Sequence, residues 1–450
     1  MQRWALLGLA AILVLLIACD DAGPSTGSSV SSATALGQQA AATAGPSATA
    51  LVLEAVQALL SEYYEELDAA RLFADAWEGA VAALRAVGVE SIPTMPAYPR
   101  DPAEATALHQ QSFRALEQAA VGRLDDEALA AAALHTLAVR RDDPHTSYRS
   151  RGLVQRDQAT RQGEAAVQLG AGFSRTEPPR VVRAPPGSPA ERAGLRAGQT
   201  IVAVNGTPVT NGADISALVD VREGVANTFT VRDATGVTEQ YTVIPARYVR
   251  PIEEHEVIEG RIGVVRLYGF PGTQEVVRRL REALLEFERQ GVEGWVLDLR
   301  DNGGGPVETV IAVASLFVER GPLFEERQRG RVINSAAADG SALTVQRPLV
   351  VLVGPGSFSG GEILPAVLQA RGRAVVVGEQ TGGGFGSSTT VPLPDGSALN
   401  VTTTEVAIGP EGRRLNRVGL TPDVVVPRTL EDVVAGRDPQ MGAAVRMLAE

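Results

Sequence analysis

The stretch "VGPGSFSGGEILPAVLQARGRAVVVGEQTGGGFGSS", residues 353–388, contains an apolar strand end, a glycine-rich turn with a serine, a helix, a strand and a second glycine-rich turn. A strand-to-helix turn of this kind presents the Ser359 hydroxyl at the edge of a sheet, and the first N–H groups of the helix point at the same place. The same serine opens an S-x-x-E capping box with Glu362. The turn alone therefore fits either a catalytic nucleophile or an ordinary helix cap, and Ser357 is the first alternative nucleophile.

Strands alternate with helices on both sides of this turn. The strands expected from the sequence are 260–268, 294–300, 348–354 and 374–378, and the expected helices are 273–290, 307–318 and 361–370. This alternation predicts an α/β fold with a mainly parallel sheet, whose sites lie at the carboxyl ends of the strands. The glycine turn "DNGGG" at 301–305 falls at such an end, where backbone N–H groups can stabilise an anion.

Short strands and turns occupy residues 165–247, with a possible helix at 212–221. The segment "SPAERAGLRAGQTIVAVNGTPV" within them resembles a PDZ domain. The resemblance implies a groove in which a peptide adds a strand to a sheet edge and its terminal carboxylate is captured by backbone N–H groups. The residues that supply these N–H groups are Gly170, Ala171 and Gly172. The apolar residues that line either the groove wall or the core of this domain are Ile215, Leu218 and Val219.

The N-terminal part of the chain reads as a leader, a tether and a helical region. "MQRWALLGLAAILVLLIACD" has the layout of a secretory signal, and its Leu-Ile-Ala-Cys resembles the bacterial lipoprotein box, which predicts lipidation of Cys19 and a membrane-anchored, extracytoplasmic protein. The alternative is a signal peptide cleaved elsewhere. Residues 20–50 are rich in Ser, Ala, Thr and Gly, as in a flexible tether. Apolar residues at helical spacing follow over 51–87 and beyond Pro102, as far as "RRDDPHTSYRS".

The composition excludes several classes of function. The net charge of -12 argues against nucleic acid as a partner. The single cysteine excludes an internal disulfide, a cysteine-rich zinc site and a thiol redox pair. The chain has no lysine, since all 41 basic residues are arginine, so a P-loop and any mechanism that needs a lysine amine are excluded within it. We expect no metal and no cofactor.

Taken together, the motifs resemble those of the carboxyl-terminal processing peptidases, the tail-specific protease family of serine peptidases. They occur in the family's order: "DDPHTSY", the PDZ domain, "DLRDNGGG", "GSFSGGEI", "AVVVGEQTGGG", "GLTPDVVV" and "DPQMGAAVRML". The resemblance implies that Ser359 is the nucleophile, that the N–H groups of Gly304 and Gly360 form the oxyanion hole, and that the PDZ groove recognises polypeptide substrates by their C-termini.

The sequence departs from the family at the general base. The family's lysine falls on Gly384, and the glutamine that accompanies the lysine falls on Ser388, so a Ser/Lys dyad cannot form. One interpretation is that His145 is the base, which resembles the related tricorn-like branch, although Pro144 stands where that branch has a serine. In the other, His145 is structural. The carboxylates that would orient a histidine base are Asp143, Glu379 and Glu405, and the other histidines are His109, His135 and His255.

Two functions from different classes follow. The first is a lipid-anchored serine endopeptidase, and the alternative is a catalytically inactive lipoprotein that only binds peptides. The predicted parts are a lipoprotein signal (1–19), a linker (20–50), a helical region (51–150), a PDZ domain (165–248), an α/β peptidase core (252–427) and a C-terminal tail helix (428–450).

Overall fold

The computed structural model describes residues 45–161, 166–174, 177–210, 212, 215, 218–233, 236–249, 251–272, 274–343 and 347–450. Cys19, the predicted signal and most of the predicted tether lie outside the described residues. The last residues of the predicted tether begin a helix, because α1 starts at Ala48.

The helical region forms four helices where the sequence predicted two helical stretches. Their bounds are α1 Ala48–Glu62, α2 Ala69–Ala86, α3 Pro102–Ala120 and α4 Asp126–Val139. Asp68, Asp101 and Asp125 begin the last three helices by accepting hydrogen bonds from backbone N–H groups of the first turn. The buried faces of the four helices pack together with Leu399 and Val401, which belong to a strand of the peptidase core.

The PDZ region contains short antiparallel strands around a small core. Its strands are β2 Ala166–Gln168, β3 Gly172–Phe173, β4 Val181–Arg183, β5 Thr200–Val204, β6 Thr207–Pro208, β7 Asn227–Arg232, β8 Thr238–Val243 and β9 Ala246–Tyr248, with helices α5 Arg151–Arg161 before them and α6 Pro189–Arg192 among them. Four of these strands form one hydrogen-bonded sheet in the order β6-β5-β7-β8. Ile215 and Phe229 are wholly buried in the core that these strands share.

The predicted mainly parallel sheet is present, with one antiparallel strand at its edge. Its order is β10-β11-β12-β15-β16-β20, and all pairs except β10–β11 are parallel. The bounds are β10 Glu253–Ile258, β11 Ile262–Leu267, β12 Gly294–Asp298, β15 Leu349–Val353, β16 Val375–Gly378 and β20 Val424–Val425. The predicted helices are α8 Glu275–Arg289, α9 Val307–Ser315 and α10 Gly360–Ala370.

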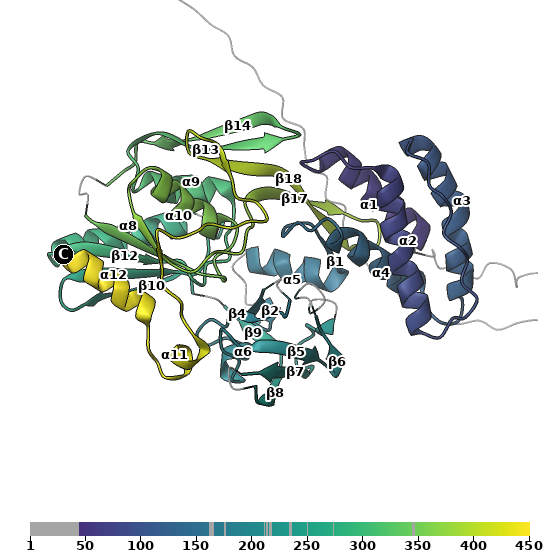
Figure 1. Cartoon of the computed structure of the whole chain (residues 1–450), viewed down its shortest axis with the longest axis horizontal. Helices are drawn as coiled ribbons and strands as arrows, with labels where there is room; N and C mark the ends of the chain where they lie inside the picture. The colour runs from purple at the N-terminus through teal and green to yellow at the C-terminus, as the bar shows by residue number, and fades with distance from the viewer. Residues whose placement is uncertain are drawn as a thin grey trace, which may run out of the picture. The chain divides into compact units, whose positions relative to one another are not determined.

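Alternate residues of the central strands face different layers, which buries the sheet on both sides. Leu297 and Val351 face the large core that includes residues of α8, α9 and α10. Val296 and Val350 face the opposite side, where they pack with Ala443 and Ala444 of α12, the C-terminal helix Pro439–Ala449, drawn in yellow in Figure 1. A short helix, α11 Leu430–Val434, precedes α12.

A second, antiparallel sheet was not predicted from the sequence. Its strands are β1 Ser147–Arg149, β13 Arg320–Gln328, β14 Arg331–Asp339, β17 Gly386–Pro392, β18 Ala398–Ile408 and β19 Arg413–Arg414. The long strand β18 pairs with β1, β13, β17 and β19. Because β1 starts two residues after His145, its pairing with β18 brings the "DDPHTSY" segment to the peptidase core.

Candidate active site

Ser359 occupies a constrained turn between β15 and α10. Its backbone φ is 55°, a left-handed conformation that is uncommon for a residue other than glycine and that clusters at functional sites. The turn is fixed from the side of β12, because Asn302 O accepts the Phe358 N–H at 2.9 Å. Ser357, the alternative nucleophile, is wholly buried and its hydroxyl donates to Leu299 O at 2.8 Å, so its role is to hold the turn.

Glu362 ties the turn of Ser359 to the second glycine turn. Its buried carboxylate accepts the Ser359 N–H at 3.0 Å, which is one arm of the predicted capping box, and the N–H groups of Gly383 and Gly384 at 2.7 Å each. The Thr381 hydroxyl donates to the same carboxylate. Burial raises the pKa of Glu362, and these hydrogen bonds oppose the rise because they favour the ionised form. One carboxylate therefore links Ser359 to the position of the family's lysine, Gly384.

The glycine turn after β12 lies against Ser359, where the resemblance places it. A Cβ on Gly304 would lie 2.7 Å from the Ser359 Cβ and 2.8 Å from the Gly360 N, so only glycine fits there. Its N–H, however, donates to Asn302 Oδ1 at 2.8 Å. In this conformation the Gly304 donor is occupied, and its predicted use in an oxyanion hole requires rotation of the preceding peptide.

His145 lies beside the turn that carries the family's lysine. Its ring contacts the Phe358 ring with a centroid separation of 4.9 Å, and a Cβ on Gly384 would lie 3.0 Å from His145 Cε1. The same Cβ would lie 2.5 Å from Phe358 Cε2. The structure thus brings His145 next to the residue that precedes Ser359, in the space that a side chain at position 384 would enter.

The three carboxylates considered for orienting His145 differ in their surroundings. Asp143 is wholly buried and accepts the His145 N–H at 3.2 Å and the Thr146 hydroxyl at 2.7 Å. Glu405 pairs with Arg414. Glu379 accepts the Arg428 N–H and the side-chain amide of Gln440. Asp143 is the one of the three with a hydrogen bond to the His145 segment, through the backbone.

Two arginines that the sequence analysis did not single out contact the glycine turns. Arg417, also at positive φ, donates its N–H to Gly383 O at 2.7 Å, and its guanidinium donates to Tyr63 Oη and Arg141 O. It therefore links the helical region to the second turn. Arg183 of β4 lies against Gly303 and donates to Gly356 O at 3.5 Å. The local sequence does not indicate these contacts, because each arginine lies far in sequence from the turn that it contacts.

The residues predicted for the PDZ groove lie in different surroundings, and their roles stay predictions. Gly172 is in β3 and faces the Arg183 side chain, because a Cβ on it would lie 2.8 Å from Arg183 Cγ. Ile215 is wholly buried in the core of the domain, a position that agrees with the alternative role as a core residue, and its role in the groove wall stays a prediction. Leu218, Val219 and Ala171 are partly buried and pack against the same core.

The other histidines lie in different surroundings. His109 is wholly buried in the helical region, where its ring stacks on Phe73 and its Nδ1 lies 3.1 Å from Tyr98 Oη. Burial lowers its pKa to about 3. His255 is on β10 beside Glu253, and His135 is on α4. Within the part of the chain that the structure describes, no three acidic, histidine or cysteine side chains gather as a metal site, and every helix is too short or too polar to span a bilayer.

Comparisons with known proteins place these features in one family. Residues 261–426 match peptidase family S41, and residues 180–233 match a PDZ domain. The chain is 32% identical to the chloroplastic C-terminal processing peptidase of Tetradesmus obliquus, over 68% of this chain and 71% of that protein. It is 30% identical to the carboxy-terminal-processing protease of Bartonella bacilliformis, over 67% and 70%. A solved structure of the photosystem II D1 C-terminal processing protease superposes with a TM-score of 0.60 and 26% identity, over 85% of this chain and 94% of that one.

Proposed function

The chain belongs to the carboxyl-terminal processing peptidases of peptidase family S41, and on this premise we propose that it is a serine endopeptidase that acts through Ser359. The observation that carries the proposal is the position of His145, whose ring lies beside both Phe358 and Gly384. We infer that His145 acts as the base on this side of the site, where the family's lysine is absent.

In the proposed reaction His145 removes the proton from Ser359 Oγ, and the oxygen attacks the carbonyl carbon of the scissile peptide. The tetrahedral oxyanion accepts hydrogen bonds from the N–H of Gly360 and from that of Gly304, once the latter leaves Asn302 Oδ1. Protonated His145 then gives its proton to the leaving amine. Water hydrolyses the acyl-enzyme in the second half of the reaction, with His145 again as base.

We propose that the PDZ domain selects polypeptide substrates through their free C-termini. The support for this is the match to the PDZ family and the glycines at positions 170 and 172 of the loop before and within β3. A peptide with an amidated C-terminus loses its charged acceptor and should bind several-fold to about 100-fold more weakly, as for a lost hydrogen bond to a charged group. Equal affinity of the free acid and the amide would contradict the proposal.

The membrane anchor is a separate proposal that rests on the lipoprotein box alone. We propose that Cys19 carries the lipid and that the peptidase faces away from the cytoplasm. A Cys19→Ser protein should leave the membrane fraction, whereas unchanged partition would show that the cysteine is not the anchor.

The decisive experiment on activity is labelling with a fluorophosphonate, which reacts with activated serines. Wild-type protein should label and cleave peptides, and Ser359→Ala should abolish both while it retains peptide binding by the PDZ domain. Ser335→Ala, which changes an exposed serine on β14, is the matched control and should label fully. Absence of labelling and cleavage in the wild type at any pH would favour the inactive peptide-binding lipoprotein.

A further inference from the structure

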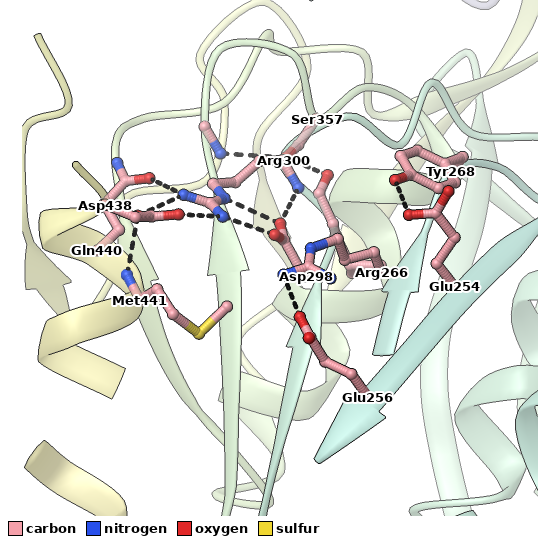
Figure 2. A network of polar contacts seen from close by, with 12 residues as sticks. Glu254, Glu256, Arg266, Tyr268, Asp298, Arg300, Ser357, Asp438, Gln440 and Met441 are labelled. Carbon is pink, nitrogen blue, oxygen red and sulfur yellow. Dashed lines mark hydrogen bonds and ion pairs between the residues drawn. The ribbon is translucent and has the colours of Figure 1, made fainter. Parts of the chain in front are cut away.

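A buried arginine links the C-terminal helix to the glycine turn beside Ser359. Arg300 is two residues beyond the end of β12, and its side chain is 13% exposed. Figure 2 shows its guanidinium between Asp298 on one side and Asp438 and Gln440 on the other. We propose that Arg300 is a positioning residue that holds the oxyanion turn in place through Asp438 at the start of α12. This inference rests on the proposed peptidase activity for its catalytic consequence.

The guanidinium makes four side-chain hydrogen bonds and one further ion-pair contact. Nε and Nη2 donate to the two oxygens of Asp298 at 2.9 and 2.6 Å. Nη1 donates to Asp438 Oδ1 at 2.8 Å and to Gln440 Oε1 at 3.0 Å, and Nη2 lies 2.8 Å from Asp438 Oδ2. The two hydrogen bonds to Asp298, together with the contacts of two guanidinium nitrogens with Asp438, fix both the position and the plane of the guanidinium, which a lysine ammonium cannot reproduce.

The main chain of Arg300 belongs to the turn that precedes the glycines. Asn302 N donates to Leu299 O at 3.0 Å, which closes this turn, and the Ser357 hydroxyl donates to the same Leu299 O. A Cβ on Gly356 would lie 2.5 Å from Arg300 O, so the two loops are in close contact at this point. A shift of residues 299–302 would therefore move the turn that carries the nucleophile.

Asn302 transmits the position of this turn to both catalytic loops. It is wholly buried, its backbone O accepts the Phe358 N–H, and its Oδ1 accepts the Gly304 N–H. Its side-chain amide donates to Leu267 O at 3.0 Å at the end of β11. Arg300 fixes the outer side of the turn, and Asn302 holds Phe358 and Gly304 on its inner side.

Asp438, the acceptor at the start of α12, is held in place by contacts other than its ion pair with Arg300. Asp438 is the N-cap of α12, and its Oδ1 also accepts the Met441 N–H at 3.0 Å. Ala443 and Ala444 anchor the helix against the sheet independently of the arginine. Loss of the ion pair should therefore release the turn without detaching α12, which separates a positioning role from a general role in stability.

The test compares Arg300→Lys and Asp438→Asn in the full-length protein with Asp438→Glu, which retains a carboxylate. Hydrogen exchange of residues 301–305 should become faster in the first two variants, while exchange of β15 stays unchanged. The value of kcat should fall by about 10²-fold, as for a small misplacement of a catalytic group, with unchanged KM, and Asp438→Glu should recover most of it. Arg278→Lys is the matched control, since Arg278 on α8 also pairs with two glutamates but is exposed.

The exchange measurement decides the inference even if the protein is not a peptidase. Unchanged exchange at 301–305 in both variants overturns it, and so does a uniform increase across the sheet, which would mean a general loss of stability. If the wild type neither labels with a fluorophosphonate nor cleaves peptides, the proposed function fails, and the exchange rates still show whether the arginine holds the turn.

Discussion

The two sides of the candidate site are built in different ways. On the nucleophile side, Glu362 and Asn302 hold the Ser359 turn by hydrogen bonds to backbone N–H groups, and both lie within the α/β core. On the base side, His145 follows the helical region and its described contact with the core is a ring packed on Phe358. Glu362 links the Ser359 turn directly to the second glycine turn, whereas the His145 segment reaches the core through the pairing of β1 with β18 and the contact of its ring with Phe358.

This difference shows which part of such a site can change. The glycines beside Ser359 leave no space for a Cβ, since one on Gly304 or Gly361 would meet backbone or side-chain atoms at 2.4–2.7 Å. At position 384 the Cβ would meet two aromatic rings, which are side chains and can be exchanged for others. We therefore expect the Ser359 turn to accept a different base, because Glu362 and Asn302 hold this turn by hydrogen bonds to its backbone.

The largest effect in this comparison is expected from His145→Ala. If His145 is the base, the substitution should lower kcat/KM by about 10²–10⁴-fold, the usual contribution of a general base, and leave PDZ binding unchanged. His255→Ala, on the exposed strand β10, is the control and should retain full activity. Full activity of His145→Ala in a protein that labels at Ser359 would assign the base to another group.

The pH dependence of kcat/KM in the wild type must be measured together with the pH dependence of stability, because acid also protonates His109 and so lowers the folded fraction. Burial lowers its pKa to about 3, so the folded state binds fewer protons than the unfolded state below the ordinary histidine pKa of about 6.5. Stability should therefore fall as pH drops from about 6.5 toward about 3, by up to about 1.4 kcal/mol per pH unit, and this loss should level off below the folded-state pKa. Only an acid limb in kcat/KM that remains after correction for the folded fraction belongs to a histidine base.

Most of the secondary structure around Ser359 could be predicted from the local sequence. The strand, glycine turn and helix around Ser359 are short-range signals, and the observed strands β12 and β15 begin and end within two residues of the prediction. The sequence did not indicate that the Gly304 N–H donates to Asn302 Oδ1, because this depends on the rotation of one peptide. A motif predicts which residues meet but does not predict the orientation of each donor.

A smaller effect is expected from Glu362→Gln on the nucleophile side. The carboxylate accepts hydrogen bonds from four donors, two on each oxygen. A glutamine amide replaces one of these oxygens with an NH₂ group, which is itself a donor, so two of the four donors would lose their acceptor. Each buried donor without an acceptor costs about 1–3 kcal/mol of unfolding free energy. Denaturant unfolding should show this loss, and Glu431→Gln, a control at an exposed glutamate, should stay within about 0.5 kcal/mol of the wild type. Equal stability of the two variants would show that Glu362 does not hold the turns together.

The base side and the second sheet were much less accessible to sequence reasoning. The second sheet joins residues 147–149 to residues 398–400, and no local pattern reports a pairing over such a separation. Arg417 contacts Gly383 and the helical region from the loop that leads into the "GLTPDVVV" segment, and that motif does not indicate either contact. The helical spacing of Ile215, Leu218 and Val219 likewise could not separate a groove from a core, since both bury one face of a helix.

The smallest change in stability is expected from Gly384→Lys, which restores the family's lysine. The new Cβ would lie 2.5 Å from Phe358 Cε2 and 3.0 Å from His145 Cε1, so the two rings must move. Overpacking of this kind costs about 1–3 kcal/mol, and it displaces His145 as well. The single variant should therefore be less stable and less active than the wild type, in spite of its lysine.

The double variant Phe358→Ala/Gly384→Lys completes this test, because it removes the ring that the new side chain meets first. It should recover stability relative to Gly384→Lys, and Phe358→Ala alone is its matched control. If the frame around Ser359 accepts either base, cleavage by the double variant should survive the further change His145→Ala, whereas cleavage by Phe358→Ala should not. A double variant that still depends on His145 would show that the fold now places only a histidine at this serine, and that the base side is as fixed as the nucleophile side.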